Sequence, residues 1–272
     1  MSIDEQGFLS NDIMQYRDQI RQRYARYFGF IQRVNTFCQQ VKFRIEGTST
    51  NDQNLMASRL IIKLLADTQG AVLLVERGLA SQARTLLRAA CETCIILRRV
   101  CQDQEFHRLF SASEELTQVR WLKNILNDTS PPLNEIREGF RQRGITLREI
   151  KRREEELKDS GVKKLEISAV AKEAGLLDLY YSAYTLYCKD THASPHVLDS
   201  YSSPDHTGDF EDISWGPVTD NLEGALLLIP RLMILGFSAI NEIVALNLGA
   251  DFNSLVTELR ALENPQGTQL RG

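Results

Sequence analysis

The stretch DQNLMASRLIIKLLADTQGAVLLVERGLASQARTLLRAACETCIILRRVCQ, residues 52–102, decides the fold. Its apolar residues recur at helical spacing on both sides of Gly78. A glycine at that position can adopt the left-handed conformation that ends many helices. The stretch therefore predicts two helices, 52–77 and 80–102. They should pack antiparallel, because the link between them is very short.

Helical periodicity recurs along most of the remaining chain. It predicts four more helices, the last of them kinked at Pro230: 11–45, 104–126, 176–190 and 218–248. Phe37 and Phe43 lie outside the apolar stripe of the first of these, which predicts burial on two of its sides. Residues 199–212 are rich in serine, aspartate and proline and are predicted to form a loop. No alternating apolar pattern of useful length predicts a strand.

A strongly charged segment follows the helix over 104–126. Two adjacent prolines, Pro131 and Pro132, cannot continue a helix. Residues 135–158 then carry 8 basic and 6 acidic side chains. This composition is typical of an exposed, salt-bridged helix or of a helical pair broken at Gly144.

These elements predict an all-α fold, a single bundle of six to eight helices. Scarce proline and abundant leucine, alanine, arginine and glutamate agree with that class. We expect four parts: a flexible N-terminus (1–10), a bundle domain (11–262), a charged helical insertion within it (132–175) and a flexible tail (263–272).

Charge and composition exclude several classes of protein. The 272 residues include 32 lysines and arginines against 36 acidic residues, a net charge of −4, so the chain is no polycation that coats nucleic acid. The apolar run 224–240 contains Pro230 and Arg231, which favours a buried core helix over a membrane span. An odd number of cysteines, five, and a polar N-terminus predict a cytoplasmic protein with no membrane partner.

The helix over 80–102 carries a polar line. Arg84, Arg88 and Glu92 lie at four-residue steps and share one face. Two interpretations are open: a solvated ladder of ion pairs, or a polar line inside the bundle that acts on a ligand.

Three of the four histidines, His192, His196 and His206, lie within 15 residues, shortly after Tyr184. A histidine at a helix end can act as an acid or a base near neutral pH. His192 and His196 could also share a metal with a third ligand from His206 or a nearby aspartate. Pro195 argues against this, because it breaks the helix that would align the pair. We therefore predict no metal site and no cofactor.

Other motifs carry less information. Cys91 and Cys94 have the spacing of a redox motif without a preceding strand, so we expect two buried thiols. A phosphate-binding glycine loop is absent from the sequence, which gives no support to ATP or dinucleotide chemistry. The basic residues between 137 and 153 either contact RNA phosphates or belong to a solvated helix, since glutamates interleave them.

Two segments carry a family resemblance. One comprises Thr68, Ala71, Leu74-Val75-Glu76-Arg77-Gly78-Leu79, Ala83, Leu87-Arg88 and Glu92, and the other comprises Tyr184 and His192-Ala193-Ser194. Together they resemble the bacterial domain-of-unknown-function family 5677, an all-helical group distantly similar to HEPN domains, over about residues 55–200. The resemblance implies that Arg88, Glu92 and His192 converge in one pocket.

The chain departs from these patterns in two places. The family often has a serine four residues before the histidine, where this chain has Cys188. HEPN ribonucleases carry an arginine and a histidine four to six residues apart on one helix, and Arg99 and His107 are too far apart to match.

Two function classes follow. In the first, the protein is a metal-independent, ribonuclease-like toxin or phage-defence effector. His192 takes the proton of a ribose 2′-hydroxyl, Arg88 stabilises the phosphate and Glu92 orients either group. The residues expected to bind its substrate are Arg84, Tyr184, Ser194 and His196.

In the second class, the protein is a non-catalytic binding or protein-interaction module, and the same arginine, glutamate and histidine form a structural network. The partners expected across the two classes are RNA, another protein and a second copy of the chain. Self-association is expected because the first and last helices are apolar on more than one face.

Overall fold

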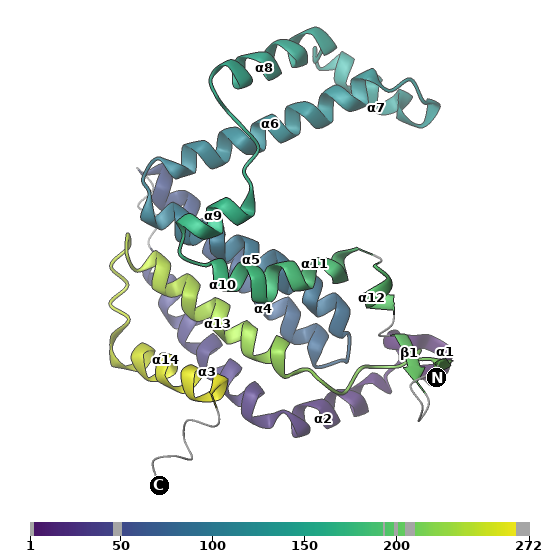
Figure 1. Ribbon diagram of the computed structural model, residues 1–272, viewed down its shortest axis with the longest axis vertical. Helices are drawn as coiled ribbons and strands as arrows, with labels where there is room; N and C mark the ends of the chain where they lie inside the picture. Colours follow the sequence, from purple (N-terminus) through teal and green to yellow (C-terminus); the bar gives the residue numbers. More distant parts are fainter. Residues whose placement is uncertain (1–2, 46–50, 193, 199–200, 205–209, 265–272) are drawn as a thin grey trace.

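The computed structural model describes residues 3–45, 51–192, 194–198, 201–204 and 210–264. Its helices are, in chain order, α1 (Ile3–Gln6), α2 (Ile13–Arg23), α3 (Ala25–Val41), α4 (Asp52–Val75), α5 (Ala80–Gln102), α6 (Phe106–Asn127), α7 (Asn134–Gln142), α8 (Leu147–Asp159), α9 (Ile167–Glu173), α10 (Leu177–Leu179), α11 (Thr185–Thr191), α12 (Pro195–Leu198), α13 (Glu223–Ile240) and α14 (Gly249–Glu263). Two short strands, β1 (Ser202–Pro204) and β2 (Phe210–Ile213), accompany them. The predicted all-α class is confirmed (Figure 1).

The centre of the molecule is the antiparallel pair α4 and α5, as predicted (Figure 1). α13 packs across both helices, and α3 packs on α13. Side chains from these helices form the main core, and Leu64, Leu87, Leu97 and Phe237 are fully buried in it. The core therefore lies between a central helix pair and the apolar helix that crosses it.

α13 is the helix predicted from the apolar run 224–240. By length and composition alone it could cross a membrane, but 67% of it is buried inside the bundle. The prediction of a buried core helix is confirmed. Pro230 lies within α13 and is itself buried.

Gly78 forms the turn between α4 and α5. Its φ of 72° is left-handed, and the N–H of Leu79 donates to the carbonyl of Leu74 at 3.0 Å, which closes the helix end. The backbone of Pro217 and Val218 crosses this turn, and the Val218 N–H donates to the Gly78 carbonyl at 3.0 Å. A Cβ on Gly78 would lie 2.9 Å from Pro217 Cα. The turn thus requires glycine for its conformation and for space.

We expect Gly78→Ala to lower the free energy of unfolding by about 1 to 2 kcal/mol, the cost of a left-handed conformation for a residue with a Cβ. The clash with Pro217 adds to it. The matched control is Gly139→Ala, because Gly139 lies in α7 with no left-handed φ and nothing within 4 Å of its added Cβ. Thermal unfolding should show a loss for the first variant alone. Equal melting temperatures would contradict this account of the turn.

The first predicted helix, 11–45, is wrong in its continuity. α2 ends at Arg23 and α3 begins at Ala25, because Tyr24 between them leaves the helical conformation (φ −107°, ψ 27°). The Tyr24 side chain is buried, and its hydroxyl donates to the carbonyl of Thr219 at 3.3 Å. A contact made by a distant segment therefore accompanies the break.

The last predicted helix, 218–248, is wrong at both ends. α13 spans Glu223–Ile240, and the chain turns at the left-handed Asn247 and enters α14 at Gly249, which is also left-handed. α14 returns to α3, where Phe252 and Phe37 pack with ring centroids 5.7 Å apart. α3 is thus covered on two sides at Phe37, as predicted, but the same prediction is wrong for Phe43, which is 78% exposed.

Two further expectations need correction. Part of the predicted loop 199–212 forms an antiparallel hairpin, in which Ser202 of β1 pairs with Ile213 of β2. Strands of three and four residues are too short for an alternating pattern to be detected. The helical segments also exceed six to eight, since the first predicted helix divides in two, α14 follows the last predicted helix and several short helical turns lie between the others.

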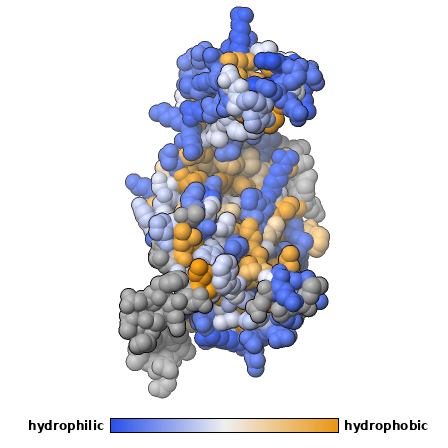
Figure 2. Space-filling model, turned by 90° about the vertical axis from the view of Figure 1, so that its right-hand side faces the viewer, coloured by the Kyte–Doolittle hydropathy of each residue, from blue (hydrophilic) through white to orange (hydrophobic). Residues whose placement is uncertain are grey.

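The charged segment is the predicted pair of helices, α7 and α8, broken at Gly144 (φ 74°). With the end of α6 they form an arm that stands away from the bundle (Figure 1). The arm has a small core of its own, made by Leu116, Val119, Ile150 and Leu157. Figure 2 shows a mostly hydrophilic surface over the arm.

Two charged residues of the arm are buried and structural. Glu154 accepts from Lys123 at 2.6 Å and pairs with Lys158 at 2.6 Å, and these cations lower its pKa to about 2. The Arg137 guanidinium donates to the carbonyls of Asp128 and Ser130 and so closes the turn before α7. Arg137 belongs to the basic set considered for RNA, and these contacts give it a structural role instead.

Candidate functional site

Polar side chains lie between α5 and α11, the helix that follows the π-helical turn η4 (Tyr180–Tyr184). α11 packs on α5. We call this set the polar seam; its members are Arg84, Arg88, Glu92, Tyr184, Cys188 and Asp190. In η4 the N–H of Thr185 donates to the carbonyl of Tyr180, five residues earlier. Such π-helical turns are rare and concentrate at functional sites.

Arg88 is the centre of the polar seam. Its Nη2 donates to the Tyr184 hydroxyl at 2.9 Å and lies 3.3 Å from Glu92 Oε2. Its Nε donates to Cys188 Sγ at 3.4 Å. The guanidinium carbon lies 4.9 Å from the centre of the Tyr184 ring, a cation–π contact. One arginine therefore connects its own helix to the facing one by three contacts.

Tyr184 is buried, and its ring stacks on that of Tyr180 at a centroid distance of 5.2 Å. Its hydroxyl donates to Glu92 Oε2 at 3.3 Å. Burial and the negative charge of Glu92 raise the pKa of Tyr184 to about 12. The hydroxyl is therefore protonated at neutral pH and acts as a hydrogen-bond donor.

Arg84 occupies the other end of the polar seam. Its Nη1 lies 3.6 Å from Asp190 Oδ1, an ion pair beyond hydrogen-bond length. The Asp190 side chain is only 7% exposed, and within the described residues its Oδ1 has no hydrogen-bond partner. The neighbouring Thr85 hydroxyl donates to the backbone carbonyl of Asp190 at 3.3 Å. Arg84 and Asp190 thus join α5 to the end of α11.

His192 lies outside the contacts around Arg88. It caps the C-terminus of α11 with an extended backbone, and its side chain is exposed. It follows Asp190 by two residues, which places it toward the Arg84 end of the polar seam and away from Glu92. Within the described residues, the His192 side chain makes no hydrogen bond or ion pair with Arg88 or Glu92. The structure therefore brings together Arg88, Glu92 and Tyr184 without the histidine.

The other two predicted substrate-binding residues follow His192. The Ser194 N–H donates to the His192 carbonyl at 2.7 Å, and its hydroxyl donates to the Lys189 carbonyl at 3.4 Å. The side chain of His196 and all of His206 lie outside the described residues. Over the part of the chain that the structure covers, no three histidine, cysteine or acidic side chains lie close enough to hold a metal.

Cys91 and Cys94 are both buried in α5, as predicted, and both are free thiols. Burial raises the pKa of Cys94 to about 12 and that of Cys91 further. A thiol with so high a pKa is a poor nucleophile and a poor metal ligand. The pair is therefore part of the core.

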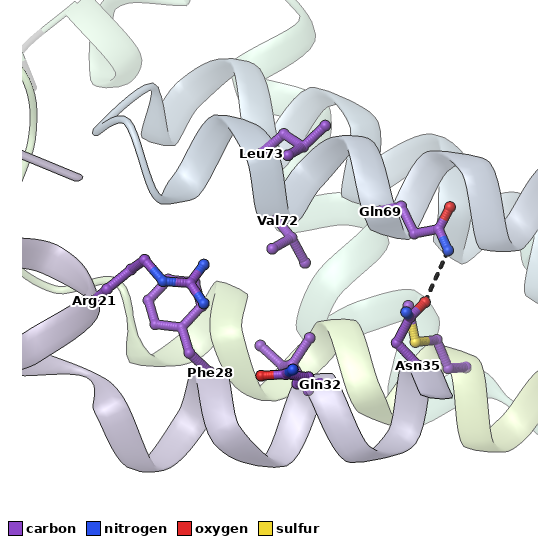
Figure 3. Close-up of a pocket in the computed structure, with 9 residues that line it drawn as sticks. Arg21, Phe28, Gln32, Asn35, Gln69, Val72 and Leu73 are labelled. Atoms are coloured by element: carbon purple, nitrogen blue, oxygen red, sulfur yellow. Dashed lines mark hydrogen bonds between the residues drawn. The ribbon is translucent and has the colours of Figure 1, made fainter. Parts of the chain in front are cut away.

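A groove between α3 and α4 is a second candidate site. Both helices pack on α13 but hardly contact each other. A pocket of about 300 Å³ lies between them, and Met233 of α13 is part of its lining. Figure 3 shows residues of α3 and α4 on the two sides of this pocket. Across one end of it, the Gln69 side-chain amide donates to Asn35 Oδ1 at 2.8 Å (Figure 3). The two helices thus leave a gap that a single hydrogen bond bridges.

The opposite end of this pocket carries an arginine. Arg21 of α2 lies over the ring of Phe28, 5.0 Å from its centroid, and its Nη1 donates to Glu76 at 2.7 Å (Figure 3). The rest of the lining is apolar or amide. Beyond Gln69 a second pocket of about 500 Å³ continues the groove toward Phe43. We call the two pockets together the α3–α4 groove.

This groove was not among the features predicted from the sequence. A signal is present in α4, because Ile62, Ala66, Gln69 and Leu73 recur at steps of four, three and four residues. They lie on a different face from the buried residues Leu64 and Val75. The pattern was obscured by the stronger core stripe, and only the structure shows that α3 leaves this face open.

Comparison with known proteins gives one result. A family model described as a family of unknown function, DUF5677, matches residues 54–210 of the chain. This range includes α4 from its third residue on, all of α5 and the whole polar seam. No curated protein and no solved structure matches the chain.

Proposed function

The chain belongs to DUF5677, a family of unknown function, and on that premise we propose that the protein is a non-catalytic protein-interaction module. The observation that carries this proposal is the mutual bonding of three residues of the polar seam, Arg88, Tyr184 and Glu92. Arg88 donates to Tyr184, and Tyr184 donates to Glu92, which is also the ion-pair partner of Arg88. Each group is satisfied by the others, as in a structural network.

The chemistry of the polar seam supports this choice. Cleavage of RNA without a metal needs a base within hydrogen-bond reach of the 2′-hydroxyl and a cation free to meet the phosphate. Tyr184 is protonated at neutral pH, since its pKa is about 12, and Glu92 is held by Arg88. In the part of the chain that the structure describes, the exposed His192 has no partner in the polar seam that would orient it as a base.

The network has a clear structural role. α11 and η4 are short elements, and a short helix owes its stability to tertiary packing. Arg88 and Arg84 of α5 contact Tyr184 and Asp190 on that segment, so they hold it against the central pair. The open α3–α4 groove lies apart from the polar seam, which is on α5. We assign binding to this groove.

The test measures RNA cleavage and stability on the same proteins. Wild type, Arg88→Ala and His192→Ala are incubated with single-stranded RNA, with and without a chelator, and their thermal unfolding is recorded. We expect no cleavage by any of them, a lower melting temperature for Arg88→Ala and an unchanged one for His192→Ala. Chelator-insensitive cleavage by wild type that is lost in His192→Ala would overturn the proposal in favour of a ribonuclease.

A further inference from the structure

We propose that the Arg84 end of the polar seam binds a small neutral ligand with an N–H donor beside a carbonyl acceptor, as in a carboxamide. Asp190 accepts from the N–H, and Arg84 donates to the carbonyl. The site lies between α5 and α11, apart from the α3–α4 groove, so this inference goes beyond the proposed function. It starts from two charged atoms, Arg84 Nη1 and Asp190 Oδ1, which lie 3.6 Å apart without a hydrogen bond between them.

Asp190 has a buried carboxylate oxygen that accepts no hydrogen bond. Its side chain is only 7% exposed, and within the described residues Oδ1 has no partner. A buried carboxylate oxygen is normally hydrogen-bonded, because water no longer solvates it. The nearby Thr85 hydroxyl does not fill this role, since it donates to the backbone carbonyl of Asp190. Oδ1 is therefore free to accept from a ligand.

Arg84 has unused donors beside this oxygen. The distance of 3.6 Å exceeds the about 2.7 to 2.9 Å of a charge-assisted hydrogen bond. Arg88, one turn further along α5, donates instead to Tyr184 and Cys188. The Arg84 side chain is 29% exposed, so this end of the polar seam reaches solvent. Because no hydrogen bond holds Arg84 within the described residues, its guanidinium can turn aside and admit a ligand to Asp190.

Tyr187 is the third residue of the site. It lies three residues before Asp190 on α11, a spacing that places the two side chains on one face of the helix. Tyr187 is buried, and burial raises the pKa of its hydroxyl, which Arg84 and Asp190 also influence. The exposed His192 follows at the end of α11. The charged pair thus lies between a buried tyrosine and the exposed end of this helix.

The opposite charges of the pair decide the chemistry of the ligand. A cation bound to Asp190 would lie beside the Arg84 guanidinium, and an anion bound to Arg84 would lie beside the Asp190 carboxylate. Like charges this close repel strongly where water is excluded. A neutral carboxamide avoids both repulsions, because its N–H donates to the carboxylate and its carbonyl accepts from the guanidinium. The N–H and carbonyl of a nucleobase edge offer the same pair of groups.

The first experiment compares three probes of one shape and different charge. Benzamide is neutral, benzoate is an anion and benzamidinium is a cation. Ligand-observed NMR with the full chain should show benzamide binding with a dissociation constant on the order of 1 to 10 mM, as for a ligand of few atoms. Benzoate and benzamidinium should bind at least about tenfold more weakly, because each meets a like charge. Uracil, tested in parallel, distinguishes a nucleobase from an open-chain carboxamide by which of the two neutral probes binds more tightly.

The second experiment changes which probe the site selects. Asp190→Asn leaves the charge of Arg84 alone and should favour benzoate over benzamidinium by about tenfold. Arg84→Gln leaves the charge of Asp190 alone and should favour benzamidinium over benzoate by a similar factor. A general loss of stability would not reverse the selection in this way. The matched control is Arg108→Gln, because Arg108 belongs to an exposed ion pair on α6 and should leave the order of the probes unchanged.

Three results would overturn the inference. If neither benzamide nor uracil binds, an ordered water alone fills the gap between Arg84 and Asp190. If the three charge states bind equally, the pair does not select the ligand. If Asp190→Asn and Arg84→Gln keep the wild-type order, the probes bind elsewhere. None of these results depends on RNA cleavage or on the α3–α4 groove, so the proposed function is decided separately.

Discussion

The Gly236→Leu variant is expected to lose more than about 3 kcal/mol of unfolding free energy, because it forces a side chain into a filled helix crossing. Gly236 lies in α13 where this helix crosses α4. A Cβ at this position would overlap Leu64 and would lie 2.9 Å from Ile61 Cδ1. The gain in helix propensity on replacing glycine, about 1 kcal/mol at most, is smaller than this cost.

The control for this variant is Ser238→Leu, which lies two residues further along the same helix with an exposed side chain. Chemical denaturation should give it a stability within about 0.5 kcal/mol of wild type. Gly236→Leu should unfold at much lower denaturant concentration or fail to fold. A Gly236→Leu protein as stable as Ser238→Leu would contradict the packing of α13 on α4.

Arg88→Ala is expected to lower the free energy of unfolding by about 1.5 to 3 kcal/mol, the range for hydrogen bonds to charged groups. The change removes donors to Tyr184 and Cys188 and leaves Glu92 without its ion-pair partner. The Arg88 side chain is partly exposed, so water takes over some of these interactions and the loss stays below that of a fully buried pair.

Arg108→Ala is the control for this prediction. Arg108 pairs with Glu105 at 2.7 Å at one helix end, where both side chains are exposed. Exposed pairs contribute at most about 1 kcal/mol, so its melting temperature should stay close to that of wild type. Equal effects of Arg88→Ala and Arg108→Ala would show that the polar seam does not stabilise the fold.

The central helices were predictable because local signals and tertiary packing agree there. Gly78 completes the turn after α4 with a left-handed conformation and also leaves space for Pro217, so glycine satisfies both demands. The apolar run of α13 predicts burial for the same reason. The structure of a segment can be predicted from sequence when its local conformational preferences agree with its packing in the fold.

The break in the first predicted helix was not predictable, because a distant segment contacts it. Tyr24 and its neighbours are compatible with a continuous helix, and the break accompanies a contact with the Thr219 carbonyl, nearly two hundred residues later. Arg137 is a second example. A basic residue is predicted to lie on the surface, but the contacts of Arg137 close a turn. Sequence spacing does not contain these tertiary contacts.

The candidate site was predictable only in part. Helical spacing places Arg84, Arg88 and Glu92 on one face, and the structure shows that this face meets Tyr184 and Asp190. The position of His192 depends on where α11 lies along α5 and on the π-helical turn before α11. Neither feature has a reliable sequence signal. The α3–α4 groove exists because α3 and α4 hardly contact each other. This arrangement is seen only in the assembled fold.

A double-mutant cycle between Arg88 and Tyr184 tests the central claim most directly. The free energy of unfolding is measured for wild type, Arg88→Ala, Tyr184→Phe and the double variant. A structural polar seam predicts a coupling energy of about 0.5 to 3 kcal/mol between these two residues, as for contacts in one network. A coupling energy of zero would contradict the claim that the polar seam holds η4, and α11 that continues it, on α5.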